Sequence, residues 1–120
     1  MTVLVDTSVW IDHFRRIVSP LSRELEEGDV LMHPFVRGEL ACGNFKNRSV
    51  AMRHLAALPL AKSATNDETL GLIERANLHG RGVGWVHAHL IASALLTKCH
   101  FWTLDERLQR AARDAGVRVR

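Results

Sequence analysis

Short, largely apolar runs rich in β-branched residues recur along this chain, and segments with helical spacing separate them. The first run, TVLV, occupies residues 2–5, and a second, DVLMH, occupies residues 29–33. The first run has no alternation of apolar and polar residues, so it fits a strand buried on both faces, as in a parallel sheet. The pattern therefore predicts an α/β fold: a three-layer α/β/α sandwich with a mostly parallel sheet.

Three further segments are predicted as strands of the same sheet, at residues 60–64, 100–104 and 117–120. Helices are predicted between the strands, over residues 8–16, 19–28, 34–43, 48–58, 65–78, 85–97 and 105–116. Ser19 suits a helix N-cap, and Thr65 with Glu68 matches a capping box. The chain has 120 residues and shows no linker or repeat, so one domain is expected over residues 1–120.

The composition is typical of a soluble globular protein, with 47% hydrophobic residues, 24% charged residues and a net charge of +3. The basic surplus mildly favours a polyanionic partner. The sequence has no CxxC pair and no HExxH segment, which argues against a zinc site. The two cysteines show no disulfide pattern, which fits a reduced, cytoplasmic protein. Asp6 and Asp12 interrupt the amino-terminal apolar segment, so neither a secretory signal nor a membrane span is expected.

Acidic residues are predicted at the carboxyl ends of the parallel strands, where open α/β sheets bind their ligands. Asp6 and Asp105 each follow a predicted strand directly, and Glu39 lies in the helix after the second strand. His87 begins a helix that should start at the same edge. Neighbouring carboxylates repel one another, and Mg²⁺ or Mn²⁺ would relieve that repulsion. Such an ion can also activate water for attack on a phosphodiester.

Each of these acids also has a structural explanation. Asp6 and Asp105 suit helix N-caps, and Glu39 suits a solvated position on a helix. A receiver-like domain phosphorylated on Asp6 is a further alternative. It requires a lysine at a strand end, and no lysine follows a predicted strand.

Three parts of the sequence resemble the PIN-domain family, and within it the VapC-type toxins of bacterial toxin–antitoxin pairs. They are VDTSVWID at residues 5–12, HPFVRGEL at 33–40, and GRGVGWVHAHLIASALL with FWTLDERL at 80–96 and 101–108. The resemblance covers nearly the whole chain in the expected order. It implies an α/β/α sandwich that hydrolyses RNA with Mg²⁺, forms a homodimer and is held inactive by a cognate VapB-type antitoxin.

The resemblance also implies roles for individual residues. Asp6, Glu39 and Asp105 match the first, second and last of the family's catalytic, metal-binding acids. Thr7 and Ser8 match the hydroxyl positions beside the first acid. They could bond its carboxylate or a metal-bound water, and helix capping explains them equally well.

His87 occupies the position at which the family normally carries a further aspartate, in a pattern like G-x-G-W-x-D-A-H-L. Histidine there removes a negative charge and a hard oxygen ligand, which should weaken Mg²⁺ binding and favour Mn²⁺. Without a metal, protonated His87 could fill the cation's place among the acids. We therefore expect either a ribonuclease with impaired activity or a catalytically weak or inactive PIN domain that binds RNA or an antitoxin.

Aromatic side chains in apolar segments are expected in the core: Trp10, Trp85, Trp102, Phe14, Phe35 and Phe45. For the phenylalanines, the resemblance offers an antitoxin groove or a dimer contact as the alternative. His89 is expected to pack in the core or on its helix surface. Several cationic side chains, Arg15 and Lys46 among them, could contact RNA phosphates, although most are expected to be solvated charges.

Overall fold

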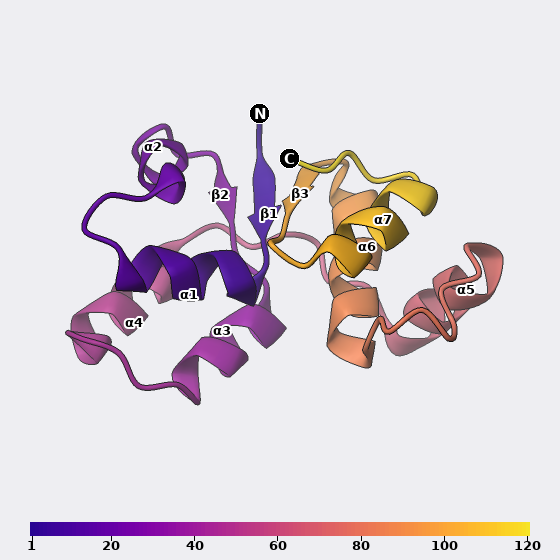
Figure 1. The fold of residues 1–120 in the computed structure, drawn as a ribbon, viewed down its shortest axis with the longest axis horizontal. Helices are drawn as coiled ribbons and strands as arrows, with labels where there is room; N and C mark the ends of the chain where they lie inside the picture. Colours follow the sequence, from indigo (N-terminus) through magenta and orange to yellow (C-terminus); the bar gives the residue numbers. More distant parts are fainter.

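The computed structural model describes residues 1–120 as a three-stranded parallel sheet accompanied by seven helices. The strands are β1 (Val3–Val5), β2 (Val30–Leu31) and β3 (His100–Trp102). The helices are α1 (Thr7–Arg15), α2 (Pro20–Glu26), α3 (Pro34–Ala41), α4 (Arg48–Ala57), α5 (Asn66–Arg75), α6 (Trp85–Thr97) and α7 (Glu106–Asp114). Figure 1 shows α1 to α4 on one side of the strands and α5 to α7 on the other. The predicted α/β sandwich with a parallel sheet is confirmed.

Strand β1 is the centre of the sheet, because the strand order is β2-β1-β3 and both pairings are parallel. Leu4 of β1 faces Leu31 on one side and Phe101 on the other, and all three residues of β1 are buried. The chain leaves β1 towards β2 and later returns to its opposite side as β3. The carboxyl ends of β1 and β3 therefore flank a topological switch point, where open α/β sheets bind ligands.

Helix α6 supplies much of the core beside β3. Every residue from Ala88 to Ala94 is buried, and a helix that is covered on all sides belongs in the interior. Helix α5 packs on α6, while α1 contacts α2 and α3 in the other group of helices. None of the helices combines the length and the hydropathy that crossing a bilayer requires.

The strand predicted at residues 60–64 is wrong beyond its first residue, since Leu60 forms only an isolated bridge with Met32. Side chains of α6 take the backbone hydrogen bonds that a strand would have made. The Lys62 N–H donates to Thr97 Oγ1 at 2.9 Å, and the Ala64 N–H donates to the Ser93 hydroxyl at 3.3 Å. The segment consequently runs along α6 instead of extending the sheet.

The strand predicted at residues 117–120 is also wrong as a regular strand. Val119 makes one isolated parallel bridge to Phe101 and no longer ladder. The two pairing bonds there run from the Phe101 N–H to the Arg118 carbonyl and from the Arg120 N–H to the Phe101 carbonyl, both at 2.9 Å. The regular sheet thus has three strands, and two single bridges extend it.

Of the two predicted helix caps, one is present in the structure and the other is not. The capping box is confirmed: Thr65 Oγ1 accepts from the Glu68 N–H at 3.0 Å, and Glu68 Oε1 accepts from the Thr65 N–H at 2.9 Å. Ser19 does precede α2, but its hydroxyl makes no cap bond and contacts His13 Nδ1. The half-buried imidazole of His13 is therefore the partner of this hydroxyl, in place of a helix amide.

Core placement is confirmed for two tryptophans and wrong for the third. Trp10 and Trp102 are buried, whereas Trp85 is 42% exposed because it begins α6 at the surface. Phe35 is exposed as well, at the start of α3. His89 lies between these two exposed rings, with both ring pairs edge-on, and also contacts Thr69 Oγ1 at 3.2 Å. The expected packing role of His89 is confirmed.

His33 is a buried imidazole at the start of α3. Its Nδ1 accepts from the Phe35 N–H at 3.0 Å, so the ring caps the helix. Its Nε2 is buried and has no hydrogen-bond partner. Burial, and to a smaller extent the neighbouring His89, lowers the pKa of His33 from 6.5 to about 4.

Acid should therefore destabilise the protein through His33. The unfolded chain takes up a proton near the ordinary pKa, whereas the folded chain does so only near pH 4, so stability present above pH 6.5 is lost between these values. From pH about 7.5 to about 5.0 the loss attributable to this group is about 2 kcal/mol. His33→Asn keeps an acceptor for the cap without titrating, so urea unfolding of the variant should show a correspondingly smaller pH dependence. Equal pH dependence of the two proteins would contradict this assignment.

Candidate functional site

Asp6 lies at the carboxyl edge of the sheet, directly after β1. Its N–H donates to the Trp102 carbonyl at 2.8 Å, which continues the β1–β3 pairing and fixes the backbone. The residue is 2% exposed. Although Asp6 is the N-cap residue of α1, its side chain makes no cap hydrogen bond, so the capping explanation is wrong. The carboxylate instead accepts hydrogen bonds from two side-chain hydroxyl groups.

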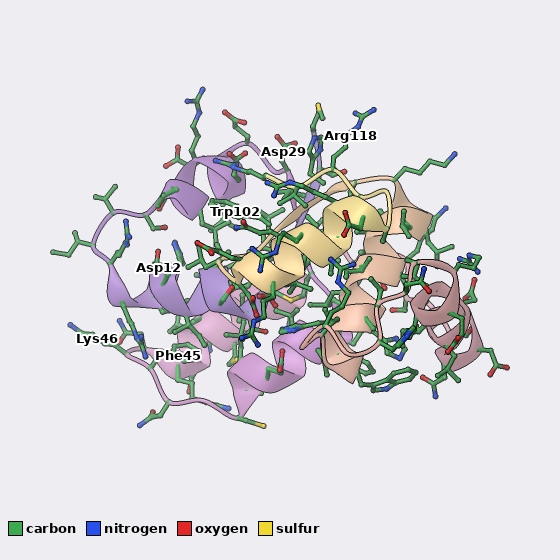
Figure 2. The ribbon with its side chains drawn as sticks, turned by 45° about the vertical axis from the view of Figure 1, so that its right-hand side comes forward. Asp12, Asp29, Phe45, Lys46, Trp102 and Arg118 are labelled. Carbon is green, nitrogen blue, oxygen red and sulfur yellow. The ribbon has the colours of Figure 1, made fainter.

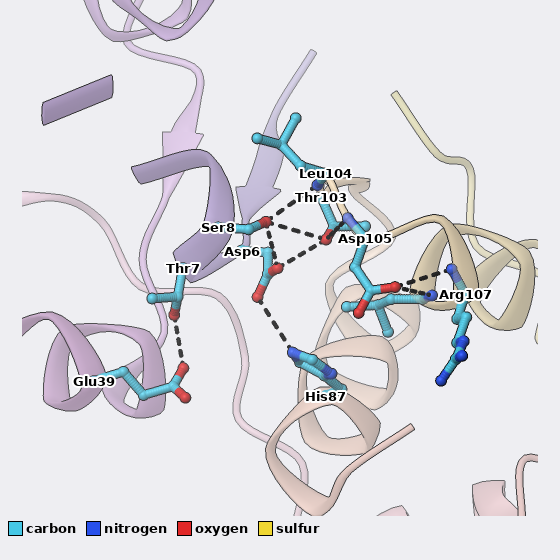
Figure 3. Close-up of polar contacts among 10 residues, drawn as sticks. Asp6, Thr7, Ser8, Glu39, His87, Thr103, Leu104, Asp105 and Arg107 are labelled. Carbon is cyan, nitrogen blue, oxygen red and sulfur yellow. Dashed lines mark hydrogen bonds and ion pairs between the residues drawn. The ribbon is translucent and has the colours of Figure 1, made fainter. Parts of the chain in front are cut away.

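One oxygen of the Asp6 carboxylate is held by two hydroxyl groups (Figure 3). Ser8 Oγ and Thr103 Oγ1 each donate to Asp6 Oδ2 at 2.8 Å. The Ser8 oxygen accepts from the Leu104 N–H and the Thr103 oxygen from the Asp105 N–H, both at 3.1 Å. Because these backbone donors point at the hydroxyl oxygens, each hydroxyl hydrogen is directed towards the carboxylate.

The other oxygen of this carboxylate, Asp6 Oδ1, is buried and has no hydrogen-bond partner. His87 Nε2 faces it at 3.8 Å, which is too long for a hydrogen bond and within the range of an ion pair (Figure 3). A buried carboxylate oxygen that accepts no hydrogen bond is costly, because burial removes the hydrogen bonds that water would donate to it. Such an oxygen is suited to contact a cation.

Glu39 lies on the exposed surface of α3 and is fixed by a neighbouring helix. Thr7 Oγ1 donates to Glu39 Oε1 at 2.6 Å. Of the two hydroxyls expected near Asp6, Ser8 therefore bonds that carboxylate, whereas Thr7 bonds the second acid and ties α1 to α3.

Asp105 is the N-cap residue of α7, and here the capping explanation is confirmed. Its Oδ1 accepts from the Arg107 N–H at 2.9 Å and from the Leu108 N–H at 3.2 Å. No hydrogen bond engages Oδ2. Asp105 can therefore cap α7 with one oxygen while it offers the other to a ligand.

These acids and His87 gather at one edge of the sheet without forming a closed coordination shell (Figure 3). No three of their ligand atoms lie within 4.8 Å of one another. The one group in the chain that meets this distance is Glu24, Glu27 and Asp29, all of which have cationic partners.

The donor set nevertheless fits a divalent cation. Asp6, Glu39 and Asp105 offer hard carboxylate oxygens. Oδ1 of Asp6 has no hydrogen bond, so a bound cation would stabilise this oxygen in particular. The nitrogen of His87 suits Mn²⁺ and other transition metals better than Mg²⁺. The donor chemistry of these residues thus fits a divalent cation.

Sequence reasoning missed Thr103, which is as closely involved with Asp6 as Ser8 is. It was expected to belong to the strand over 100–104, but β3 ends one residue earlier. Its hydroxyl bonds Asp6, and its carbonyl accepts from Gln109 Nε2 at 2.8 Å. The signal that could have found it is a hydroxyl residue between a buried strand and a strand-end acid, in the segment FWTLD.

Replacing Thr103 by valine should destabilise the protein. The change removes a hydroxyl that donates to a buried carboxylate and leaves the Asp105 N–H without its acceptor. We expect a loss of about 1.5–3 kcal/mol in the free energy of unfolding, measured by urea titration. Thr2→Val, at an exposed position, is the control and should change stability by less than about 0.5 kcal/mol. Equal stability of the two variants would show that the hydroxyl does not support Asp6.

Comparison with known proteins adds independent information. A family model for the PIN domain matches residues 3–114. Ribonuclease VapC32 of Mycobacterium tuberculosis is 43% identical over 116 residues, which cover 96% of this chain and 94% of that protein.

Solved structures with the same fold are more distant in sequence. The structure of FitAB bound to the IR36 DNA fragment has a TM-score of 0.69 at 18% identity, covering 99% of this chain and 94% of that chain. FitAcB from Neisseria gonorrhoeae has a TM-score of 0.65 at 20% identity, covering 98% and 96%. These structures agree with the α/β sandwich described above.

Proposed function

This chain belongs to the PIN-domain family, and we propose that it is a metal-dependent endoribonuclease, the toxin of a type II toxin–antitoxin pair. The observation that carries the proposal is the Asp6 carboxylate, which is buried, held at one oxygen by two hydroxyls and unpartnered at the other. Most buried polar atoms in proteins have a hydrogen-bond partner, so the free oxygen of Asp6 favours a ligand-binding role. The 43% identity to a VapC ribonuclease supports RNA as the substrate.

Asp6, Glu39, Asp105 and His87 would hold the divalent cation, Mg²⁺ or Mn²⁺. When bound, the ion would supply a Lewis acid and an activated water for phosphodiester hydrolysis. The protein's other side chains would hold the metal-binding acids in fixed orientations. Ser8 and Thr103 hold the Asp6 carboxylate so that its free oxygen faces His87, and Thr7 holds Glu39. The amino terminus of α7 holds Asp105.

His87 makes the site less suited to magnesium than one lined by carboxylates alone. It supplies a nitrogen donor, and it lies 3.8 Å from the one Asp6 oxygen that has no other partner. We propose that the chain binds Mg²⁺ weakly, hydrolyses RNA slowly with it and works better with Mn²⁺.

We propose the partners that the resemblance to VapC-type toxins implies. They are RNA in the cytoplasm, a cognate VapB-type antitoxin that holds the enzyme inactive, and a second copy of the chain in a homodimer. Expression alone should arrest growth, and co-expression of the protein encoded beside it should relieve the arrest.

A second candidate function is a PIN domain that binds RNA or an antitoxin with little or no hydrolysis. His87 is the observation that favours it, since it contacts the oxygen that a cation would use. The open arrangement of Glu39 and Asp105, each held by a contact of its own, is consistent with either function.

Asp6→Asn tests the catalytic proposal. The amide keeps the size of the side chain and can accept from both hydroxyls, but it lacks the charge needed to hold a divalent cation. Cleavage of single-stranded RNA in Mn²⁺ should fall by about 100-fold or more, whereas the folded structure is retained. Asp12→Asn changes a partly exposed acid that pairs with Arg16; it is the control and should cleave like the wild type. Wild-type cleavage by Asp6→Asn would contradict the proposal.

His87→Asp tests the effect of the imidazole. The added carboxylate should raise cleavage in Mg²⁺ by about tenfold or more and reduce the advantage of Mn²⁺. Rates that match the wild type in Mg²⁺ would refute the proposed role of His87. If neither protein cleaves RNA with either metal and both still bind it, the binding-module function is correct.

A further inference from the structure

A cavity of about 430 Å³ opens between α1, α3 and the loop that joins α3 to α4. Glu39, one of the acids of the candidate site, forms part of its wall. The cavity and the candidate site therefore share a side chain. Its volume is in the range of pockets that enclose a small organic group.

An aromatic column leads from the core to this cavity. Trp10 is buried, and Phe14 stacks on it with a centroid distance of 5.9 Å. Phe45 stacks on Phe14 at 4.4 Å with the rings nearly parallel, at 7°. Both phenylalanines are partly exposed and line the cavity. Because every nucleobase has a π-face, any of the four bases can extend such a column, so the RNA sequence matters little.

Cations at the cavity have no acidic partner. Arg15 and Lys46 line it and are exposed, and no carboxylate pairs with either. Arg16 and Arg23, on the neighbouring surface, do pair with acids. Free positive charges beside stacked rings complement a ligand that carries both a phosphate and a base.

The loop that carries Phe45 is held in place. Arg48 donates from Nη2 to the Ala41 carbonyl and from Nε to the Gly43 carbonyl, which fixes both sides of the turn. Figure 2 shows Phe45 and Lys46 together on this loop, beside α1 and α3. The wall of the cavity therefore exists before a ligand binds, which lowers the cost of ordering it.

We propose that this cavity is a subsite for one nucleotide of single-stranded RNA next to the bond that is cleaved. The base stacks on Phe45, at the end of the column, and the phosphates of the nucleotide lie at Arg15 and Lys46. The subsite rests on the proposed ribonuclease function, because sharing Glu39 with the candidate metal site puts a bound nucleotide beside the reaction. The cavity combines aromatic rings with cations that have no acidic partner, and this combination favours a nucleotide over an apolar peptide.

The stacking part is tested by RNA binding in EDTA, where cleavage is absent. The probes are fluorescein-labelled homopolymers of A, U and C, about ten nucleotides long, followed by anisotropy. Phe45→Leu keeps an apolar side chain without the ring and should weaken binding by about tenfold. Phe35→Leu, an exposed phenylalanine outside the cavity, is the matched control and should bind within about twofold of the wild type. Equal affinities for Phe45→Leu and the wild type would overturn the subsite.

The charge part is tested by the salt dependence of the same binding. Lys46→Ala and Arg15→Ala should each reduce the slope of log K against log salt by about 0.7, the value for one phosphate contact on a single strand. Arg53→Ala removes an exposed cation of α4 outside the cavity and should leave the slope unchanged. Unchanged slopes for both cavity variants would overturn the proposed phosphate contacts.

Cleavage kinetics separate this proposal from the one on which it rests. Wild-type cleavage with an unaltered KM in Phe45→Leu overturns the subsite and leaves the ribonuclease function intact. A wild-type protein that neither binds nor cleaves RNA overturns both. Variants that keep RNA affinity but lose inhibition by the co-expressed antitoxin would identify the cavity as a peptide groove, and the RNA assignment would be wrong.

Discussion

The pairing of β1 with a parallel neighbour on each side is the interaction on which the rest of the structure depends. All three residues of β1 are buried, and its hydrogen bonding continues one residue further, from the Asp6 N–H to the Trp102 carbonyl. That last bond fixes a carboxylate at the edge where the chain switches from one side of the sheet to the other. The same register sets Thr103, the residue after β3, close enough to donate to Asp6. The position of the site is thus a consequence of the central strand pairing.

The Asp6 carboxylate combines firm positioning with incomplete neutralisation. Two hydroxyls, each oriented by a backbone N–H, hold one oxygen, while the other is buried without a partner. The carboxylate therefore keeps one buried oxygen without a hydrogen bond, an unsatisfied state of a kind that functional sites commonly show. A divalent cation would relieve it, and His87 at 3.8 Å is the group in this chain that competes for the same oxygen. Under the proposed function, metal preference would depend on His87, which lies opposite a carboxylate held by two hydroxyls.

Much of the fold and the neighbourhood of the site could be predicted, because both depend on local patterns. Short apolar segments that alternate with helical segments predicted the parallel sheet, and the acids that follow two of them predicted the edge where Asp6 and Asp105 lie. The strand expected at 60–64 failed because Ser93 and Thr97, about thirty residues away in sequence, take its backbone hydrogen bonds. Thr103 was missed because only the register of β3 against β1 shows that its hydroxyl meets Asp6. Such long-range partners have no local signature.

The central claim is that the unpartnered oxygen of Asp6 belongs to a cation site. Binding of Mn²⁺ to the purified protein, followed by the electron paramagnetic resonance signal of the free ion, tests it without reference to any catalytic activity. We predict one saturable site in the wild type that is lost in Asp6→Asn and retained in Asp12→Asn. Equal Mn²⁺ binding by the wild type and Asp6→Asn, or no binding by either, would contradict the claim.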